Sequence, residues 1–232
     1  MEDSKNRIVL KSSITEYEFN EKYWKYYLLL EKEFFDLSYY VSIDLAKNGK
    51  TYSLAYLKLL LAIGSEFDVV CKKICKLLDE KIDENKCDIN DYKNVFKDQL
   101  SQLYNYDVLV TEINELITKP LKNMNTQYLP NFWNTYNQVK HHRADNDNIK
   151  KANQGTVLNA LSSLYIIERI FVFINTTNLS NDSVLLNEFN FARFKSKRLY
   201  IKEFDSINVY NLRNIFEEIK KKTNLIFVVK IN

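Results

Sequence analysis

The sequence predicts an all-α fold, an up-and-down helical bundle of four main long helices plus short helices, with a small C-terminal α+β extension. Two observations carry this prediction. The 232 residues include only three glycines and two prolines, whereas turn-rich β folds need many of both. Long stretches also repeat apolar residues every three or four positions, which is the spacing of one face of a helix.

The first long helix is expected from about Thr15 to Ala46, and Gly49 should end it. Its apolar stripe is Leu30, Phe34, Leu37, Val41 and Leu45. A second helix is expected from Ser53, a favourable N-cap residue, to about Lys81. Its stripe is Leu60, Ile63, Phe67, Val70, Ile74 and Leu77. Two long helices joined by a short link must lie antiparallel, so a helical hairpin opens the fold.

The later elements are shorter or less regular. We expect a helix from Asn90 to Leu103 and a strand at 108–110. Pro130 suits the first turn of the helix that carries the histidines, and a long helix should follow from about Lys151 to Asn175. In the C-terminal segment we expect a helix at 208–222 and a strand at 225–230.

We divide the chain into a helical bundle, residues 1–178, and a basic, aromatic-rich extension, residues 179–232. The candidate nucleic-acid-binding residues of the extension are Arg193, Lys195, Lys197 and Arg198, which lie among Phe191, Phe194 and Tyr200 with no acidic residue between them. Basic residues set among aromatic ones can follow a phosphate backbone and stack on bases. The alternative is an amphipathic hairpin with a solvated basic face.

Composition excludes several classes of function. Three glycines cannot build a Gly-rich phosphate loop or a dinucleotide-binding fingerprint, and we expect no cofactor. Cys71, Cys75 and Cys87 are odd in number, which favours buried, reduced thiols over disulfides, and we expect no metal site. The start of the chain resembles no signal peptide, and Glu168 and Arg169 interrupt the most apolar run. We therefore expect a cytoplasmic protein with no membrane segment.

The two histidines of the chain are adjacent, in the segment from Phe132 to Arg143. Histidine exchanges protons near neutral pH, so any acid-base chemistry is expected there. Helical spacing places Asn137, Lys140 and His141 on a polar stripe with Trp133, beside an apolar stripe. That apolar stripe is Phe132, Tyr136 and Val139. The alternative is an ordinary helix end, where cationic side chains bond the last carbonyls.

Two carboxylates fall on apolar helical stripes, Glu66 and Glu168. A buried carboxylate needs a partner because its desolvation is costly. We expect that partner to come from Lys140, His141, His142 or Arg143, and a contact between Glu66 and His141 would make either an acid-base site or a structural ion pair.

The order of these motifs resembles uncharacterised bacterial relatives of the HEPN superfamily, over roughly residues 15–178. The residues that carry the resemblance are Tyr52, Ser53, Leu60, Ser65, Glu66 and Asp68, then Trp133, Tyr136, Asn137, Val139, Lys140, His141 and Arg143, then the helix from Asn159 to Tyr165. The resemblance implies a helical bundle that is usually a homodimer, a role in phage defence, abortive infection or toxin–antitoxin systems, and in many members metal-independent ribonuclease activity.

The family's active site is an Arg-x4–6-His motif, and this chain departs from it. Asn137 stands five residues before His142, where the family has arginine. If activity persists, the resemblance implies that His141 acts as general acid or base, that Lys140 or Arg143 stabilises the phosphorane, that Asn137 orients the phosphate and that Glu66 fixes the imidazole. His142 is a further candidate catalytic residue. The alternative is a non-catalytic module that binds RNA, a nucleotide, a cognate antitoxin or another defence protein. A purely structural histidine–glutamate pair is a third possibility.

Overall fold

The computed structural model describes residues 7–8, 14–117, 119–125, 130–145, 147–177, 193–201 and 226–227. Most of them are helical, which confirms the mostly helical fold expected from the sequence. The helices are α1 (Glu16–Phe19), the π-helical turn η1 (Asn20–Trp24), α2 (Lys25–Asp36), η2 (Leu37–Tyr39), α3 (Leu54–Leu78), α4 (Ile89–Gln99), η3 (Ser101–Asn105), η4 (Lys122–Asn125), α5 (Asn131–His142), α6 (Asn148–Lys151) and α7 (Gln154–Thr177). The strands are β1 (Arg7–Ile8), β2 (Val108–Val110), β3 (Glu115–Ile117), β4 (Leu199–Tyr200) and β5 (Ile226–Phe227).

The first helical segment ends at Tyr39 rather than near Ala46, so the predicted end of this helix is wrong. In the following loop the Asp44 carboxylate accepts hydrogen bonds from the backbone N–H groups of Ala46 and Lys47, at 3.1 and 3.0 Å. Such local side-chain bonds offer the backbone an alternative to the helix.

The later predictions hold more closely. The Ser53 hydroxyl caps α3 by accepting a hydrogen bond from the backbone N–H of Tyr56 at 3.1 Å, which confirms the predicted cap. Pro130 immediately precedes α5, and the strand expected at 108–110 is β2. The three cysteines are buried free thiols, as expected.

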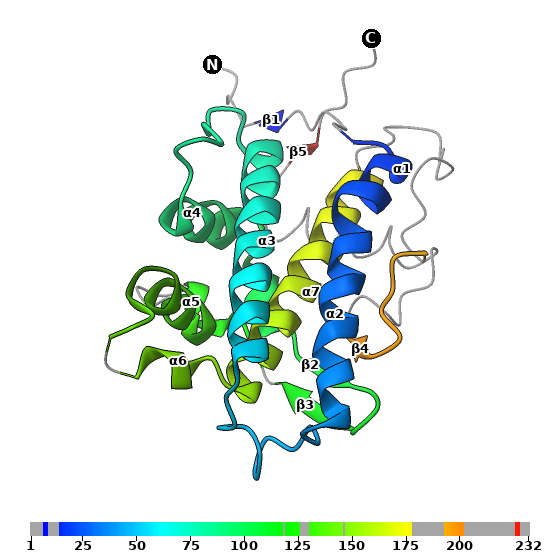
Figure 1. Ribbon diagram of the computed structural model, residues 1–232. Coiled ribbons are helices and arrows are strands. Elements are labelled where there is room, and N and C mark those ends of the chain that lie inside the picture. The colour runs from blue at the N-terminus through cyan, green and yellow to red at the C-terminus, as the bar shows by residue number, and fades with distance from the viewer. Residues whose placement is uncertain are drawn as a thin grey trace, which may run out of the picture.

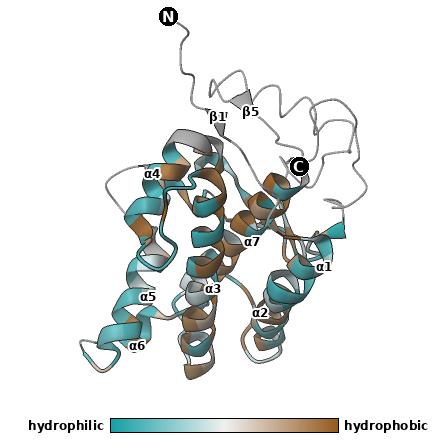
Figure 2. Cartoon of the chain, turned by 90° about the horizontal axis from the view of Figure 1, so that it is seen from above, coloured by the Kyte–Doolittle hydropathy of each residue, from teal (hydrophilic) through white to brown (hydrophobic). Residues whose placement is uncertain are grey.

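Helix α7 lies in the middle of the bundle, between α3 and α2 (Figures 1 and 2). Helices α2 and α3 form the antiparallel hairpin, and α7 runs in the same direction as α3 because both begin at one end of the bundle (Figure 1). At that end the backbone N–H of Gln154 donates to the carbonyl of Thr51 at 2.8 Å, and Tyr52 forms a β-bridge with Asn153.

The burial of α7 explains its apolar composition. One stretch of it, Gln154–Asn175, is long and apolar enough to span a membrane, contrary to our expectation that no segment suits a bilayer, and 94% of its most apolar window is buried inside the protein. Packing on several sides accounts for this apolarity, since a helix that is hydrophobic all round is a buried one.

Two small sheets complete the described part. Strand β2 pairs antiparallel with β3 and with β4, while β1 pairs parallel with β5. The segment 193–201 packs on the bundle, where the fully buried ring of Phe194 meets the rings of Phe19 and Trp24 at centroid distances of 4.9 and 5.8 Å. The helix expected at 208–222 lies outside the described residues, and β5 falls within the strand expected at 225–230.

Candidate functional site

Helix α5 is anchored to the bundle by an aromatic face. Its buried side chains are Phe132, Trp133, Tyr136 and Val139, each at most 5% exposed. The ring of Phe67 on α3 meets those of Phe132 and Trp133 at centroid distances of 5.2 and 5.7 Å. Trp133 therefore belongs to the core, and the prediction that it shares the polar stripe is wrong.

Helices α3 and α5 are in close contact at Gly64. A Cβ atom at this glycine would lie 2.4 Å from Cδ2 of Tyr136, well inside van der Waals contact. The absence of a side chain at Gly64 thus lets the Tyr136 ring lie on the backbone of α3. This contact positions α5 and the polar residues that follow Tyr136.

The predicted polar residues gather at the C-terminal end of α5, where Figure 2 shows mainly hydrophilic residues. Asn137 is half-buried, whereas Lys140, His141, His142 and Arg143 are exposed. The two imidazole rings lie side by side with centroids 6.5 Å apart. Lys140 places its Nζ atom 5.3 Å from the centre of the Tyr136 ring, on the same helix. The structure therefore brings four polar groups to one exposed helix end.

The chain after α5 folds back on this end. Nδ1 of His142 lies 3.4 Å from Oδ2 of Asp145, and the Asn148 amide donates a hydrogen bond of 2.7 Å to the His142 carbonyl. Sequence reasoning missed Asp145 as a member of this cluster. The i,i+3 spacing of histidine and carboxylate at a helix end was the signal that could have found it.

Glu66 does not join this cluster, so the predicted contact between Glu66 and His141 is wrong. Gly64 and Phe67 face α5, and the 100° rotation per residue turns Glu66 to another side of α3. No described residue from 137 to 143 forms an ion pair or hydrogen bond with it. Its charge acts instead on Tyr23. Burial, together with the carboxylates of Glu66 and Glu168, raises the pKa of Tyr23 to about 12.

Two carboxyl groups are buried in the bundle, Glu66 on α3 and Glu168 on α7. Glu168 is fully buried, and no described residue donates a hydrogen bond to either of its carboxyl oxygens. Burial raises the pKa of Glu66 to about 7. Burial, with the charge of Glu66, raises the pKa of Glu168 well above its ordinary value. Both carboxyls are therefore held toward their neutral, protonated forms.

The basic residues of segment 193–201 serve partly to attach it. Arg193 forms an ion pair of 2.6 Å with Glu16. Arg198 pairs with Glu112 at 3.1 Å and stacks over the ring of Phe35 at 4.8 Å. Lys197 is exposed and Lys195 half-buried. The carboxylates that pair with Arg193 and Arg198 thus come from α1 and from the turn after β2, and not from α5.

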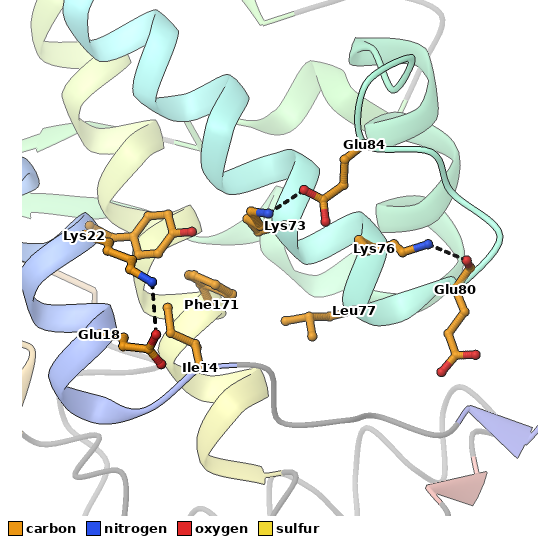
Figure 3. Close-up of a pocket in the computed structure, with 10 residues that line it drawn as sticks. Ile14, Glu18, Lys22, Lys73, Lys76, Leu77, Glu80, Glu84 and Phe171 are labelled. Atoms are coloured by element: carbon orange, nitrogen blue, oxygen red, sulfur yellow. Dashed lines mark hydrogen bonds and ion pairs between the residues drawn. The ribbon is translucent and has the colours of Figure 1, made fainter.

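A cavity of about 520 Å³ opens elsewhere, between η1, α3 and α7 (Figure 3). Its lining residues are Ile14, Glu18, Lys22, Tyr23, Lys73, Lys76, Leu77, Glu80, Glu84 and Phe171. Lys22 pairs with Glu18 at 3.0 Å and Lys73 pairs with Glu84. The lining charges are balanced, and none of the α5 residues takes part. Among the described residues no group of three or more His, Cys, Asp or Glu side chains is placed to hold a metal.

In comparisons with known proteins, no family model matches the chain, and neither a curated protein nor a solved structure shows a significant match.

Proposed function

We propose that this protein is a HEPN-like module of a bacterial defence or toxin–antitoxin system and that it binds RNA through the C-terminal end of α5. In this proposal the four longest helices are the up-and-down bundle of that family, and the bundle serves to present Lys140 and Arg143 to the phosphates.

One observation carries the proposal. Lys140 and Arg143 are exposed cations for which the described part of the chain supplies no acidic partner. A cation that is already paired must break its ion pair to reach a phosphate, whereas these two are available at once. Phosphate contacts from such side chains supply most of the sequence-independent affinity for nucleic acid.

The test is a binding measurement with a fluorescently labelled RNA at several salt concentrations. Lys140→Ala and Arg143→Ala should each weaken binding and reduce the steepness of its salt dependence. Lys32→Ala is the matched control, since Lys32 is an exposed lysine on α2 that pairs with Asp36. If the two α5 variants bind RNA as tightly as the wild type, the proposal fails.

A second candidate, an endoribonuclease, is favoured by the two adjacent imidazole rings. One imidazole would take the proton of a ribose 2′-hydroxyl as its oxygen attacks the phosphorus, and the other would give a proton to the departing 5′-oxygen. The products would be a 2′,3′-cyclic phosphate and a 5′-hydroxyl. Lys140 or Arg143 would stabilise the phosphorane, Asn137 would orient the phosphate, and a homodimer would bring two such sites together.

Cleavage of total cellular RNA in the presence of a chelator tests this candidate. His141→Ala and His142→Ala should each abolish cleavage while binding persists. Equal cleavage by the wild type and both variants would remove the histidines from the mechanism. If the wild type binds RNA without cleaving it, the protein is the non-catalytic binding module. Its partner would then be RNA alone, or RNA with a cognate antitoxin or defence protein.

A further inference from the structure

The end of the bundle where α2 leads to α3 and where α6 leads into α7 carries exposed aromatic and basic residues. We call this the basal surface, and it lies at the bottom of Figure 1. Its residues are Tyr39, Tyr40, Lys47, Lys50, Tyr52 and Lys150.

Gln154 holds the two chain segments of the basal surface together. This residue is fully buried at the start of α7. Its amide donates to the carbonyl of Ser42 at 3.1 Å, two residues after Tyr40, and its backbone N–H donates to the carbonyl of Thr51 at 2.8 Å, one residue before Tyr52. The hydrogen bonds of Gln154 therefore hold in place the backbone next to the exposed tyrosines.

The tyrosines of the basal surface are unusually exposed for large aromatic residues. Tyr39 and Tyr40 are 87% and 86% exposed, and Tyr52 is 47% exposed. No ring of the described residues packs against them. A large aromatic ring that contributes this little to the core has its faces available for a ligand.

The charge of this end is positive. The segments 39–55 and 147–155, which form this end, contain four lysines against two aspartates. Lys47 and Lys150 pair with Asp44 and Asp147, at 3.3 and 2.8 Å. Lys50 is exposed and has no acidic partner among the described residues. An anionic ligand matches this balance.

The basal surface is continuous with the end of α5. The hydrogen bond from Asn148 to the His142 carbonyl holds α6 against α5. Lys150, on α6, is close enough to Tyr52 that the tyrosine adds to the effect of Asp147, the main cause of the raised pKa of this lysine. An RNA strand bound at Arg143 can thus continue over Lys150 to Tyr52.

We propose that the basal surface binds single-stranded RNA, whose bases stack on Tyr39, Tyr40 and Tyr52 while Lys50 and Lys150 contact its phosphates. The choice of RNA rests on the proposed function of the α5 end. Stacking on exposed rings accepts any base but requires that the base be unpaired, so the surface selects single strands and not a particular sequence.

The experiment compares binding of a 12-nucleotide single-stranded RNA, the same RNA in a duplex, and single-stranded DNA of the same sequence. Removal of one stacking ring by Tyr52→Ala should weaken single-strand binding about tenfold, and the Tyr39→Ala/Tyr40→Ala pair should weaken it further. Duplex binding should change less than twofold. Tyr17→Ala is the matched control, because Tyr17 is 74% exposed on α1, at the far end of the bundle. Thermal unfolding of every variant checks that the fold is kept.

The outcomes separate this inference from the proposed function. If Lys140→Ala and Arg143→Ala weaken binding while the tyrosine variants bind as the wild type does, the basal surface is not the RNA site and the α5 proposal stands. Equal affinity for single strand and duplex, or tighter binding of DNA than of RNA, would also overturn the inference. So would tyrosine variants that change only the oligomeric state, since the surface would then join copies of the chain. A wild type that binds no RNA overturns both proposals.

Discussion

The ring of Tyr136 lies directly on the backbone of Gly64, where a Cβ atom would come within 2.4 Å of the ring carbon Cδ2. Both residues are buried, and the neighbouring ring of Trp133 stands 5.1 Å from that of Tyr136 between centroids. The tyrosine therefore has little freedom to move aside. Together with the packing of Phe67 on Phe132 and Trp133, this contact fixes how α5 docks on α3.

Gly64→Ala should consequently destabilise the protein. At an ordinary helical position this change stabilises by about 1 kcal/mol because glycine is a poor helix former, but overpacking a dense core costs about 1–3 kcal/mol. The net effect should be a lower free energy of unfolding, measured by urea denaturation. Ser65→Ala, at the exposed next position, is the control and should be close to neutral. A Gly64→Ala protein more stable than the wild type would contradict the close contact.

The buried carboxyl group of Glu66 predicts a specific pH dependence of stability. The pKa of Glu66 is raised to about 7, so the folded protein binds this proton more tightly than the unfolded chain does. The stability that this proton contributes is therefore fully present below a pH of about 4.5, the ordinary pKa of the group. It is lost as the pH rises toward about 7. A pKa shift of this size changes the free energy of unfolding by at most about 3 kcal/mol.

Glu66→Gln should flatten this decline, and the variant should be more stable than the wild type at pH 8, because the amide has no proton to lose. Urea unfolding at pH 5, 6, 7 and 8 measures the effect. Ser65→Ala again provides the control on the same helix and should keep the wild-type slope. Parallel curves for Glu66→Gln and the wild type would show that this carboxyl does not carry the dependence.

Gln154 should be among the polar residues that contribute most to stability. Its side chain bonds the carbonyl of Ser42, the backbone N–H of Asp44 and the hydroxyl of Tyr56, at 3.1, 3.3 and 3.1 Å. Gln154→Ala removes all three bonds at a fully buried position and takes this partner from the buried Tyr56 hydroxyl, which should cost about 2–4 kcal/mol.

Hydrogen exchange should show faster exchange in the loop 41–52 of the Gln154→Ala protein than in the wild type. The control is Gln138→Ala, since Gln138 is exposed and accepts one bond from Lys151. Similar melting temperatures for the two variants would argue against a central role for Gln154.

Ser196 should hold the segment 193–201 on the bundle. Its hydroxyl donates to the Glu31 carboxylate and accepts from the backbone N–H groups of Arg198 and Leu199, at 2.9 and 2.8 Å. The same carboxylate accepts a bond of 2.7 Å from the Tyr27 hydroxyl. Loss of this network through Ser196→Ala should cost about 1–3 kcal/mol.

Limited proteolysis with trypsin measures the release of this segment, which should be cut faster in Ser196→Ala than in the wild type. Lys195→Gln and Lys197→Gln remove two cleavage sites and so identify where cutting occurs. If the Ser196→Ala protein is cut no faster at positions 193–198, the network is not what attaches the segment.

The sequence predicted elements better than it predicted how they face one another. The α3 stripe and the Ser53 cap are local features, so the helix Leu54–Leu78 could be found from periodicity. The end of the first helix was missed because Leu45 continues the stripe by coincidence. The loop bonds of the Asp44 carboxylate compete there with helical ones.

The cluster at the end of α5 was predicted because its members are neighbours in sequence, whereas the surroundings of Glu66 were not. Those surroundings depend on the rotation of α3 about its own axis, which the contacts of Gly64 and Phe67 with α5 determine. A glycine at one helical position does not reveal which distant ring covers it. The burial of Glu66 away from the histidines therefore emerges only from the packed structure.

Helices α3 and α7 share the most extensive helix–helix contact of the described elements, although the whole segment from Asp79 to Asn153 separates them along the chain. Closing so long a loop is entropically unfavourable before any contact across it can compensate. Acquisition of the native state should therefore be slow for a helical protein. Before α7 packs, the apolar surface of α3 that it covers is exposed to solvent, and a newly synthesised chain is most prone to aggregation during this interval.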